Sequence, residues 1–186
     1  KAKDGMPMAR VRGEALQFML AGHETTANAM NWLWYLLAKN PEARDRMFKE
    51  IDTVLGDRTP GLDDLAALPW TTACIEEAMR FYSPVPILPR LAIKDDIIGG
   101  HHIRKGTTVI VPAHLVHHDP RVWENPEHFD PSRFLPGADV GRSRSAYLPF
   151  GGGRRICIGR SFALMEMVLI AATRGRQLTV DLCPGH

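Results

Sequence analysis

The sequence predicts a mainly α-helical protein with a small β region in the middle. Three observations support this fold class. Apolar residues recur at helical spacing over residues 12–39 and again over 158–173. Between them, in residues 87–111, short apolar pairs alternate with turn signals, which is typical of strands. These turn signals are Asp95-Asp96, Gly99-Gly100 and Lys105-Gly106.

The first helix is expected over residues 12–39 and is long for a globular protein. Its central segment, residues 21–26, is a weak helix sequence, because a glycine and two β-branched threonines occur close together. Such a segment bends a helix or opens it for function. Asn40 and Pro41 then end this helix and start a second, with Asn40 as N-cap and Pro41 at the first helical position. The second helix is expected to end near Leu55.

The middle of the chain changes character several times. Residues 56–68 are rich in turn formers, and a short helix is expected over residues 71–81, before Ser83-Pro84. After the β region, residues 112–149 are punctuated by proline and form an irregular meander. A segment of this length without regular structure is usually functional or packed by its own side chains.

Composition excludes several classes of protein. The 186 residues, 45% of them hydrophobic, suit one ordinary domain. No apolar run approaches the length of a transmembrane helix, so we expect no membrane segment in this chain. With 23 Lys+Arg against 21 Asp+Glu there is no nucleic-acid signature. Three scattered cysteines, Cys74, Cys157 and Cys183, favour a reducing compartment, and a soluble cytoplasmic protein is expected.

The segment around Cys157 has the strongest chemical signal in the sequence. For a lone cysteine the simplest interpretation is a buried residue in a turn, but three successive glycines, 151–153, let the backbone approach a flat partner closely. Arg154, Arg155 and the start of the next helix all favour the thiolate. One thiolate cannot form a closed zinc site, but it can serve as the axial ligand of a haem. Between Val140 and Met165 there is no acidic residue, and the arginines there are Arg142, Arg144, Arg154, Arg155 and Arg160.

The order Phe-x-x-Gly-x-Arg-x-Cys-x-Gly over residues 150–159 resembles the haem-binding loop of the cytochrome P450 monooxygenases. The resemblance implies that Cys157 is the axial ligand of the iron of haem b and that Arg155 pairs with a haem propionate. It also implies that Phe150 shields the sulfur, while Gly153 and Gly159 permit a loop that directs backbone N–H groups at it. Further cofactor contacts are expected from Pro149, Ala21, Gly22 and Ala163.

Two further segments resemble structural motifs of the same family. Glu77-Ala78-Met79-Arg80 resembles its Glu-x-x-Arg helix motif, and Pro131-Ser132-Arg133-Phe134 resembles the element whose arginine joins that pair. Taken alone, Glu77 and Arg80 would form an exposed i,i+3 pair that contributes a few tenths of a kcal/mol. Together with Arg133, the resemblance implies a structural network that holds the meander against the helix behind the haem.

The resemblance also extends to the expected substrate side. Arg90 matches the position that commonly contacts the other propionate. The residues shortly before it would face the substrate, and these are Val85, Pro86, Ile87 and Leu88.

Ala21-Gly22-His23-Glu24-Thr25 resembles the oxygen-binding groove of the family's long central helix, with Glu24 where Asp is the commoner residue. The resemblance implies that Gly22 leaves room for dioxygen and that Glu24 and Thr25 are catalytic, delivering protons as an acid–alcohol pair. The alternative is that the Thr25 hydroxyl merely bonds back to a carbonyl one turn earlier.

Other metal signals are weak. His23-Glu24 begins a zinc-protease motif, but Ala27 stands where the second histidine is required. Five histidines later in the chain match no closed zinc pattern and are interpreted as loop or surface residues. They are His101, His102, His114, His117 and His118.

The resemblance covers the C-terminal, haem-binding part of the cytochrome P450 fold, so we expect residues 1–186 to form a single incomplete domain without the family's N-terminal portion. Part of the central helix would then expose its apolar face, and the final β elements would be short or absent. The implied activity is insertion of one oxygen atom from O2 into a small organic, apolar substrate.

The implied electron donor is a ferredoxin, a flavodoxin-like protein or a reductase, docking at Arg142, Arg144, Arg154 and Arg160. Two alternatives remain at this point. One is a peroxide-driven or isomerising haem-thiolate enzyme. The other is a truncated, non-catalytic chain with weak or no haem binding.

Overall fold

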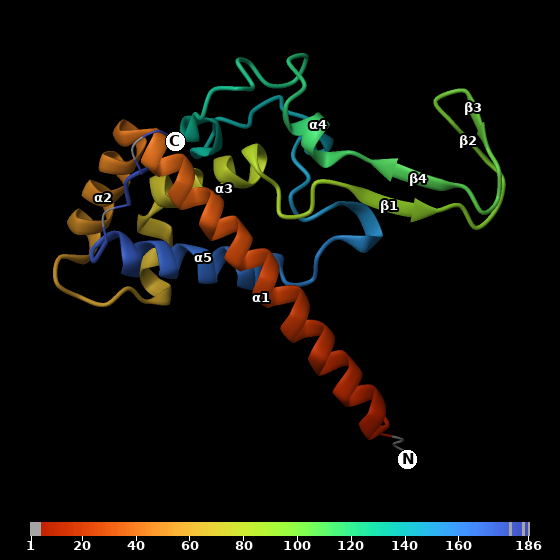
Figure 1. Ribbon diagram of the computed structural model, residues 1–186, viewed down its shortest axis with the longest axis horizontal. Helices are drawn as coiled ribbons and strands as arrows, with labels where there is room; N and C mark the ends of the chain where they lie inside the picture. Colours follow the sequence, from red (N-terminus) through yellow and green to blue (C-terminus); the bar gives the residue numbers. More distant parts are fainter. Residues whose placement is uncertain (1–4, 179, 184, 186) are drawn as a thin grey trace.

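The computed structural model describes residues 5–178, 180–183 and 185. Four long helices form the body of the protein, and two small antiparallel sheets form an arm that extends from it (Figure 1). The predicted mainly α-helical fold with a small β region is confirmed. The elements arise in the order of the sequence expectation, although several boundaries and contacts differ.

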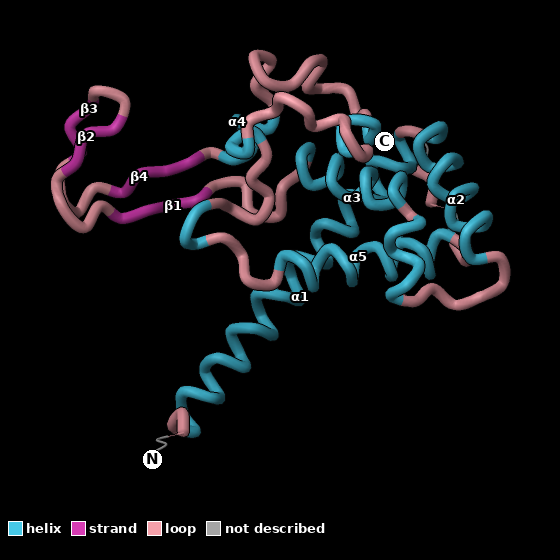
Figure 2. The backbone as a smooth tube through the Cα atoms, turned by 180° about the vertical axis from the view of Figure 1, so that it is seen from behind, coloured by secondary structure: helices cyan, strands magenta, loops and turns pink. Residues whose placement is uncertain are grey.

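Helix α1 spans Met8–Lys39 and begins four residues before the expected start at residue 12. The helix continues through residues 21–26, so this weak sequence does not open it. Every buried residue of α1 lies at Thr26 or later. The N-terminal half projects away from the body (Figure 2). It exposes apolar side chains such as Phe18 (60% exposed) and Leu20 (67% exposed).

Asn40 joins α1 to helix α2, which spans Pro41–Leu55. Pro41 occupies the first helical position, but the Asn40 side chain makes no capping hydrogen bond to α2. Its Nδ2 instead donates to the Leu36 carbonyl oxygen at 2.8 Å, near the end of α1. The expectation of an Asn40 side-chain N-cap is therefore wrong, because this side chain satisfies an unpaired carbonyl of the preceding helix.

Helices α3 (Pro69–Phe81) and α5 (Arg160–Gly175) complete the body, packing against α2 and the C-terminal half of α1. The core takes apolar side chains from all four helices, and its most buried members include Leu33, Leu37, Met47, Ile51, Ile75, Met79, Met167 and Ala171. At Gly175 an added Cβ would lie only 3.1 Å from the Phe48 ring. This glycine therefore allows the end of α5 to approach α2 closely.

The β region consists of two hairpin-like pairs. Strand β1 (Leu88–Leu91) pairs with β4 (Thr108–Val111), with Leu88 opposite Val111. Strand β2 (Asp96–Ile98) pairs with β3 (His101–Ile103) at the far end of the arm. The strands are short and largely exposed, so the arm adds little to the core.

The meander runs back across α3 and contains only short elements. These are α4 (Ala113–His117) and the 3₁₀ helices η2 (Pro131–Phe134) and η3 (Arg144–Ala146), while η1 (Leu62–Ala67) lies earlier and η4 (Gly153–Arg155) follows. Within the described residues no strand follows α5. The last residues of the chain include Pro184 and His186, which lie outside the described residues.

Candidate functional site

The loop that carries Cys157 connects η4 to α5. The Cys157 N–H donates to the Phe150 carbonyl at 3.0 Å, which closes the loop, and the side chain of Cys157 is exposed. Gly151 and Gly153 adopt φ angles of +71° and +67°, a left-handed conformation that disfavours other residues. Because α5 begins at Arg160, the loop presents the thiol close to a helix N-terminus.

The other two cysteines lie in different surroundings. Cys74 is fully buried on α3, and burial raises the pKa of its thiol. Cys183 is exposed in the coil after α5. Only Cys157, among the described cysteines, combines exposure with a glycine-rich loop and a helix N-terminus. Its thiol is therefore the best placed to ligate an external group.

The residues around Cys157 suit a flat group that needs a single axial ligand. Within the described part of the chain, no three His, Cys, Asp or Glu side chains gather into a metal site. Beneath the loop, a cavity of about 40 Å³ is lined by Glu76, Tyr147, Pro149, Phe150, Gly151, Ile156 and Arg160. Burial raises the pKa of Glu76 in this cavity. A single exposed thiol on a left-handed glycine loop matches the donor set of a haem-thiolate centre.

The arginines predicted to meet the haem or a partner lie in different environments. Arg155 is exposed on η4, and Arg90 on β1 is exposed with its Nη1 donating to the Pro89 carbonyl at 2.8 Å. The loop approaches β1 at Gly151, where a Cβ would lie 3.9 Å from a Leu88 methyl carbon. No contact in the described residues joins Arg90 to Arg155.

Arg142 is half-buried, unlike the other arginines predicted to dock a partner. Its guanidinium lies over the Trp123 ring, 4.4 Å from the centroid, and its Nη2 donates to the Arg133 carbonyl at 2.9 Å. Burial lowers the pKa of Arg142. This half-buried side chain holds the meander together, so it offers less charge to a docking partner than an exposed arginine. Arg144, Arg154 and Arg160 remain exposed.

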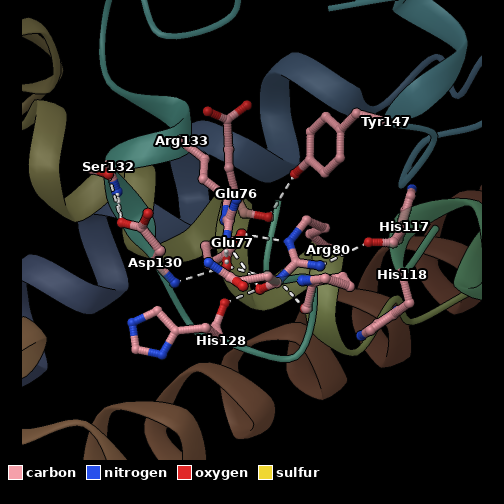
Figure 3. Close-up of polar contacts among 12 residues, drawn as sticks. Glu76, Glu77, Arg80, His117, His118, His128, Asp130, Ser132, Arg133 and Tyr147 are labelled. Atoms are coloured by element: carbon pink, nitrogen blue, oxygen red, sulfur yellow. Dashed lines mark hydrogen bonds and ion pairs between the residues drawn. The ribbon is translucent and has the colours of Figure 1, made fainter. Parts of the chain in front are cut away.

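Glu77 and Arg80 form a fully buried ion pair on α3, with Nε–Oε2 at 2.7 Å and Nη2–Oε1 at 2.8 Å (Figure 3). Arg133 Nε lies 3.6 Å from Glu77 Oε1. The Asp130 N–H also donates to Glu77, at 2.9 Å. Burial raises the pKa of Glu77, and the hydrogen bonds from Arg80 oppose that rise.

Arg80 links α3 to two distant parts of the meander. Its Nη1 donates to the His117 carbonyl at 2.7 Å, and its Nη2 donates to the Pro126 carbonyl at 2.8 Å. The three residues predicted as a network are thus brought together by geometry. On an exposed helix this ion pair would contribute little to stability. In this fold Arg80 connects α3 to residues 37 and 46 positions further along the chain.

His117 is completely buried, so the expectation of a loop or surface residue is wrong for this histidine. Its Nε2 accepts a hydrogen bond from the Leu148 N–H at 2.8 Å. Burial lowers the pKa of His117 to about 4, which keeps the ring neutral and Nε2 free to accept. This side chain connects α4 to the residue that precedes Pro149 and the Cys157 loop.

His117 is expected to make stability depend on pH. Between pH 6.5, the ordinary histidine pKa, and pH 4 the unfolded chain binds a proton that the folded chain does not. Stability from this residue is therefore complete above pH 6.5 and decreases by on the order of 3 kcal/mol as the pH falls to 4. Unfolding free energies measured across this range should have a smaller slope in His117→Phe. An unchanged slope would contradict the assignment.

Two aromatic residues in the same region were not singled out by the sequence interpretation. Trp123 is 1% exposed, and its ring centroid lies 5.2 Å from the Arg80 guanidinium and 4.4 Å from that of Arg142. Tyr147 donates its hydroxyl hydrogen to the Glu76 carbonyl at 2.8 Å, and burial raises its pKa. Their sequence neighbours show no periodic pattern, so only the meander's path across α3 identifies them as core residues.

The predicted oxygen-binding segment lies midway along α1, where the helix enters the body. Thr25 Oγ1 donates to the Ala21 carbonyl at 2.7 Å, which is the geometry of the alternative interpretation. Glu24 and Gly22 are exposed. Helices α1 and α5 pack against each other, and Ala163 is half-buried on α5.

The four residues expected to face substrate form the approach to β1. Val85, Pro86 and Ile87 are exposed, and Leu88 is half-buried. The Pro86 carbonyl accepts a hydrogen bond from the His114 N–H at 3.1 Å, which ties this segment to α4.

Comparison with known proteins decides the family. A family model described as Cytochrome P450 matches residues 1–186. The chain belongs to the cytochrome P450 family. Membership implies a haem cofactor, which the donor set around Cys157 fits.

Three relatives illustrate how much of a cytochrome P450 this chain represents. Cytochrome P450 132 of Mycobacterium tuberculosis is 63% identical over 180 residues, covering 97% of this chain and 39% of that protein. Human cytochrome P450 4F12 is 41% identical over 178 residues (92% of this chain, 34% of that protein). Rat cytochrome P450 4A10 is 43% identical over 171 residues (91% and 33%). The chain thus spans well under half the length of these relatives.

Among the described residues, no helix is long and apolar enough to cross a bilayer.

Proposed function

We propose that the whole protein is a haem-thiolate monooxygenase that inserts one oxygen atom from O2 into an organic, apolar substrate. The observation that carries this proposal is the exposed Cys157 thiol, held by a left-handed glycine loop at the N-terminus of α5. When bound, haem b would supply the chemistry of oxygen activation through its iron. The protein's own residues would bind the group, orient it and move protons.

Cys157 would ligate the iron as a thiolate, and the loop would shape its surroundings. Phe150 and Pro149 line the cavity beneath the loop. Gly153 has a left-handed φ of +67°, and a Cβ at Gly159 would lie 3.8 Å from the Cys157 sulfur. Arg155 and Arg90 are both exposed and would pair with the two haem propionates.

Glu24 and Thr25, which lie beside Ala21 and Gly22 on α1, would deliver protons to the bound oxygen. The bond from Thr25 Oγ1 to the Ala21 carbonyl uses the hydroxyl hydrogen and leaves the oxygen lone pairs free. Thr25 Oγ1 can therefore accept a hydrogen bond from a water and hold it in place. The exposed Glu24 carboxylate would exchange that water's proton with solvent.

The classes of substrate and electron donor are inferred from one apolar segment and one group of exposed arginines. Val85, Pro86, Ile87 and Leu88 are apolar and would contact a small apolar substrate. Arg144, Arg154 and Arg160 would attract an acidic electron donor, which we assign to the ferredoxin, flavodoxin-like or reductase class. A cytoplasmic location is proposed because the scattered cysteines favour a reducing compartment.

A carbon monoxide spectrum of the reduced whole protein tests the proposed function. Thiolate ligation is expected to give the strongly red-shifted Soret band that a cysteine ligand produces. Incorporation of labelled oxygen from ¹⁸O2 into a product would then establish monooxygenation. A carbonyl band typical of a neutral ligand would contradict the proposal.

Replacing Thr25 by alanine should separate two routes of turnover. We expect O2-driven turnover to fall by about 10²-fold, the typical contribution of a positioned proton donor, while peroxide-driven turnover is retained. Thr53→Ala is the matched control, because Thr53 Oγ1 also bonds back one turn, to the Lys49 carbonyl at 2.7 Å. Equal loss of both routes in Thr25→Ala would support the purely helical role of the hydroxyl instead.

Removing the docking charge should change the salt dependence of reduction. Replacing Arg144, Arg154 and Arg160 together by glutamine is expected to slow reduction about tenfold at low salt. The difference should shrink above 0.1 M salt, where exposed charges are screened beyond about 10 Å. Arg12→Gln, on the projecting half of α1, is the control. A salt dependence equal to that of the unmodified protein would contradict the docking surface.

A further inference from the structure

Beside the Glu77–Arg80 network, α4 carries two histidines one helical turn apart. His114 lies on α4 and His118 is the residue at its C-terminal cap, four positions later. This spacing places both side chains on the same face of the helix. Their ring centroids are 4.4 Å apart with planes inclined by 43°. His114 is exposed and His118 is half-buried, so solvent reaches the pair.

Hydrogen bonding determines which nitrogen of His118 is available. His118 Nδ1 lies 2.9 Å from the His114 carbonyl oxygen. Because a carbonyl can only accept, Nδ1 must carry the hydrogen, and in the neutral ring Nε2 keeps its lone pair. Histidines that bind metals usually donate their other ring N–H to such an acceptor, which fixes the tautomer and raises the basicity of the ligating nitrogen.

We propose that His114 and His118 form a surface site for a divalent transition-metal ion of the class that prefers imidazole, represented by Ni²⁺. Two imidazoles one turn apart can chelate a single ion, and metal–nitrogen distances near 2 Å are compatible with rings this close. No third His, Cys, Asp or Glu joins them within the described residues, so water completes the coordination.

The electrostatic surroundings of His118 are compatible with this site. Burial lowers the pKa of His118, which favours the neutral, ligating ring near neutral pH. The hydrogen bond to the His114 carbonyl opposes this and raises the pKa, as does the Glu127 carboxylate, whereas the charges of the His114 ring and of Arg80 lower it. Glu127 therefore favours positive charge at the ring and compensates in part for Arg80.

The neighbouring His117 is excluded from the site. It is fully buried, and its Nε2 already accepts from the Leu148 N–H. Figure 3 shows His117 and His118 leaving the chain toward different sides. The proposed site is thus distinct from the Cys157 loop and from the buried network.

Calorimetric titration of the haem-loaded whole protein with Ni²⁺ tests the site, in a Cys183→Ser background that removes an exposed thiol. One ion per chain is expected, with affinity reduced at least tenfold in both His114→Ala and His118→Ala. His101→Ala and His102→Ala are the matched controls, because these histidines are adjacent on β3 and point to opposite faces of the strand. Affinity unchanged in His114→Ala, or reduced equally by the controls, would overturn the proposal.

A second readout separates lost ligation from lost structure. In the unsubstituted histidine background, Ni²⁺ should protect His114 and His118 from acylation by diethyl pyrocarbonate, detected by mass spectrometry, while His101 and His102 stay reactive. Equal reactivity of His114 and His118 with and without saturating Ni²⁺ would also overturn the site.

Discussion

Cys157→Ala is expected to abolish the red-shifted carbonyl band of the reduced whole protein and, with it, all O2-driven turnover. Among the described cysteines, only Cys157 is exposed on a left-handed glycine loop beside a helix N-terminus. Alanine removes the ligand while keeping the backbone of the loop, including the bond from the residue 157 N–H to the Phe150 carbonyl. The spectrum should therefore change even where the protein remains folded.

Cys183→Ala is the matched control for this experiment, because Cys183 is also exposed but lies in coil after α5. It should retain the red-shifted band and full turnover. Far-UV circular dichroism of both variants checks that the helices persist. A red-shifted band that survives in Cys157→Ala and disappears in Cys183→Ala would identify Cys183 as the iron ligand and refute the proposed site.

Glu77→Ala is expected to destabilise the folded protein by about 3–5 kcal/mol, the cost of leaving one partner of a buried ion pair uncompensated. Both side chains are completely buried, and Arg80 would keep its charge without a carboxylate nearby. The Asp130 N–H would also lose its acceptor. Chemical denaturation and the rate of haem loss, measured on the whole protein, report this change.

Arg121→Ala provides the comparison for an exposed ion pair. Arg121 pairs with Asp119 in the same meander, but its side chain is 87% exposed, so water screens the pair and its loss should cost far less than the loss of Glu77. A double variant, Glu77→Leu with Arg80→Leu, should recover part of the loss, because it leaves no unpaired charge. If Glu77→Ala cost no more than Arg121→Ala, the network would have no structural role.

Helix periodicity and turn residues were good guides to the elements but poor guides to their ends and their contacts. Helix α1 begins at Met8, where the Pro7 carbonyl accepts the first helical hydrogen bonds from the Arg10 and Val11 N–H groups, whereas the apolar pattern starts only near residue 12. Asn40 has the sequence of an N-cap, yet its amide serves the Leu36 carbonyl of the helix before it. The preference of asparagine for helix ends places Asn40 at the boundary. It does not decide whether the side chain bonds to the helix before it or to the helix after it.

The sequence by itself determined the local backbone of the Cys157 loop, because the glycines, arginines and cysteine that define it lie within ten consecutive residues and act through local backbone geometry. Only the tertiary structure decided the burial and the contacts of Glu77, Arg80, His117 and Arg142. Glu77 and Arg80 have the spacing of an exposed pair, and become a buried one only because the meander returns across α3 with its carbonyls turned toward Arg80. Burial depends on which distant segment covers a side chain, and that information is not contained in the neighbouring residues.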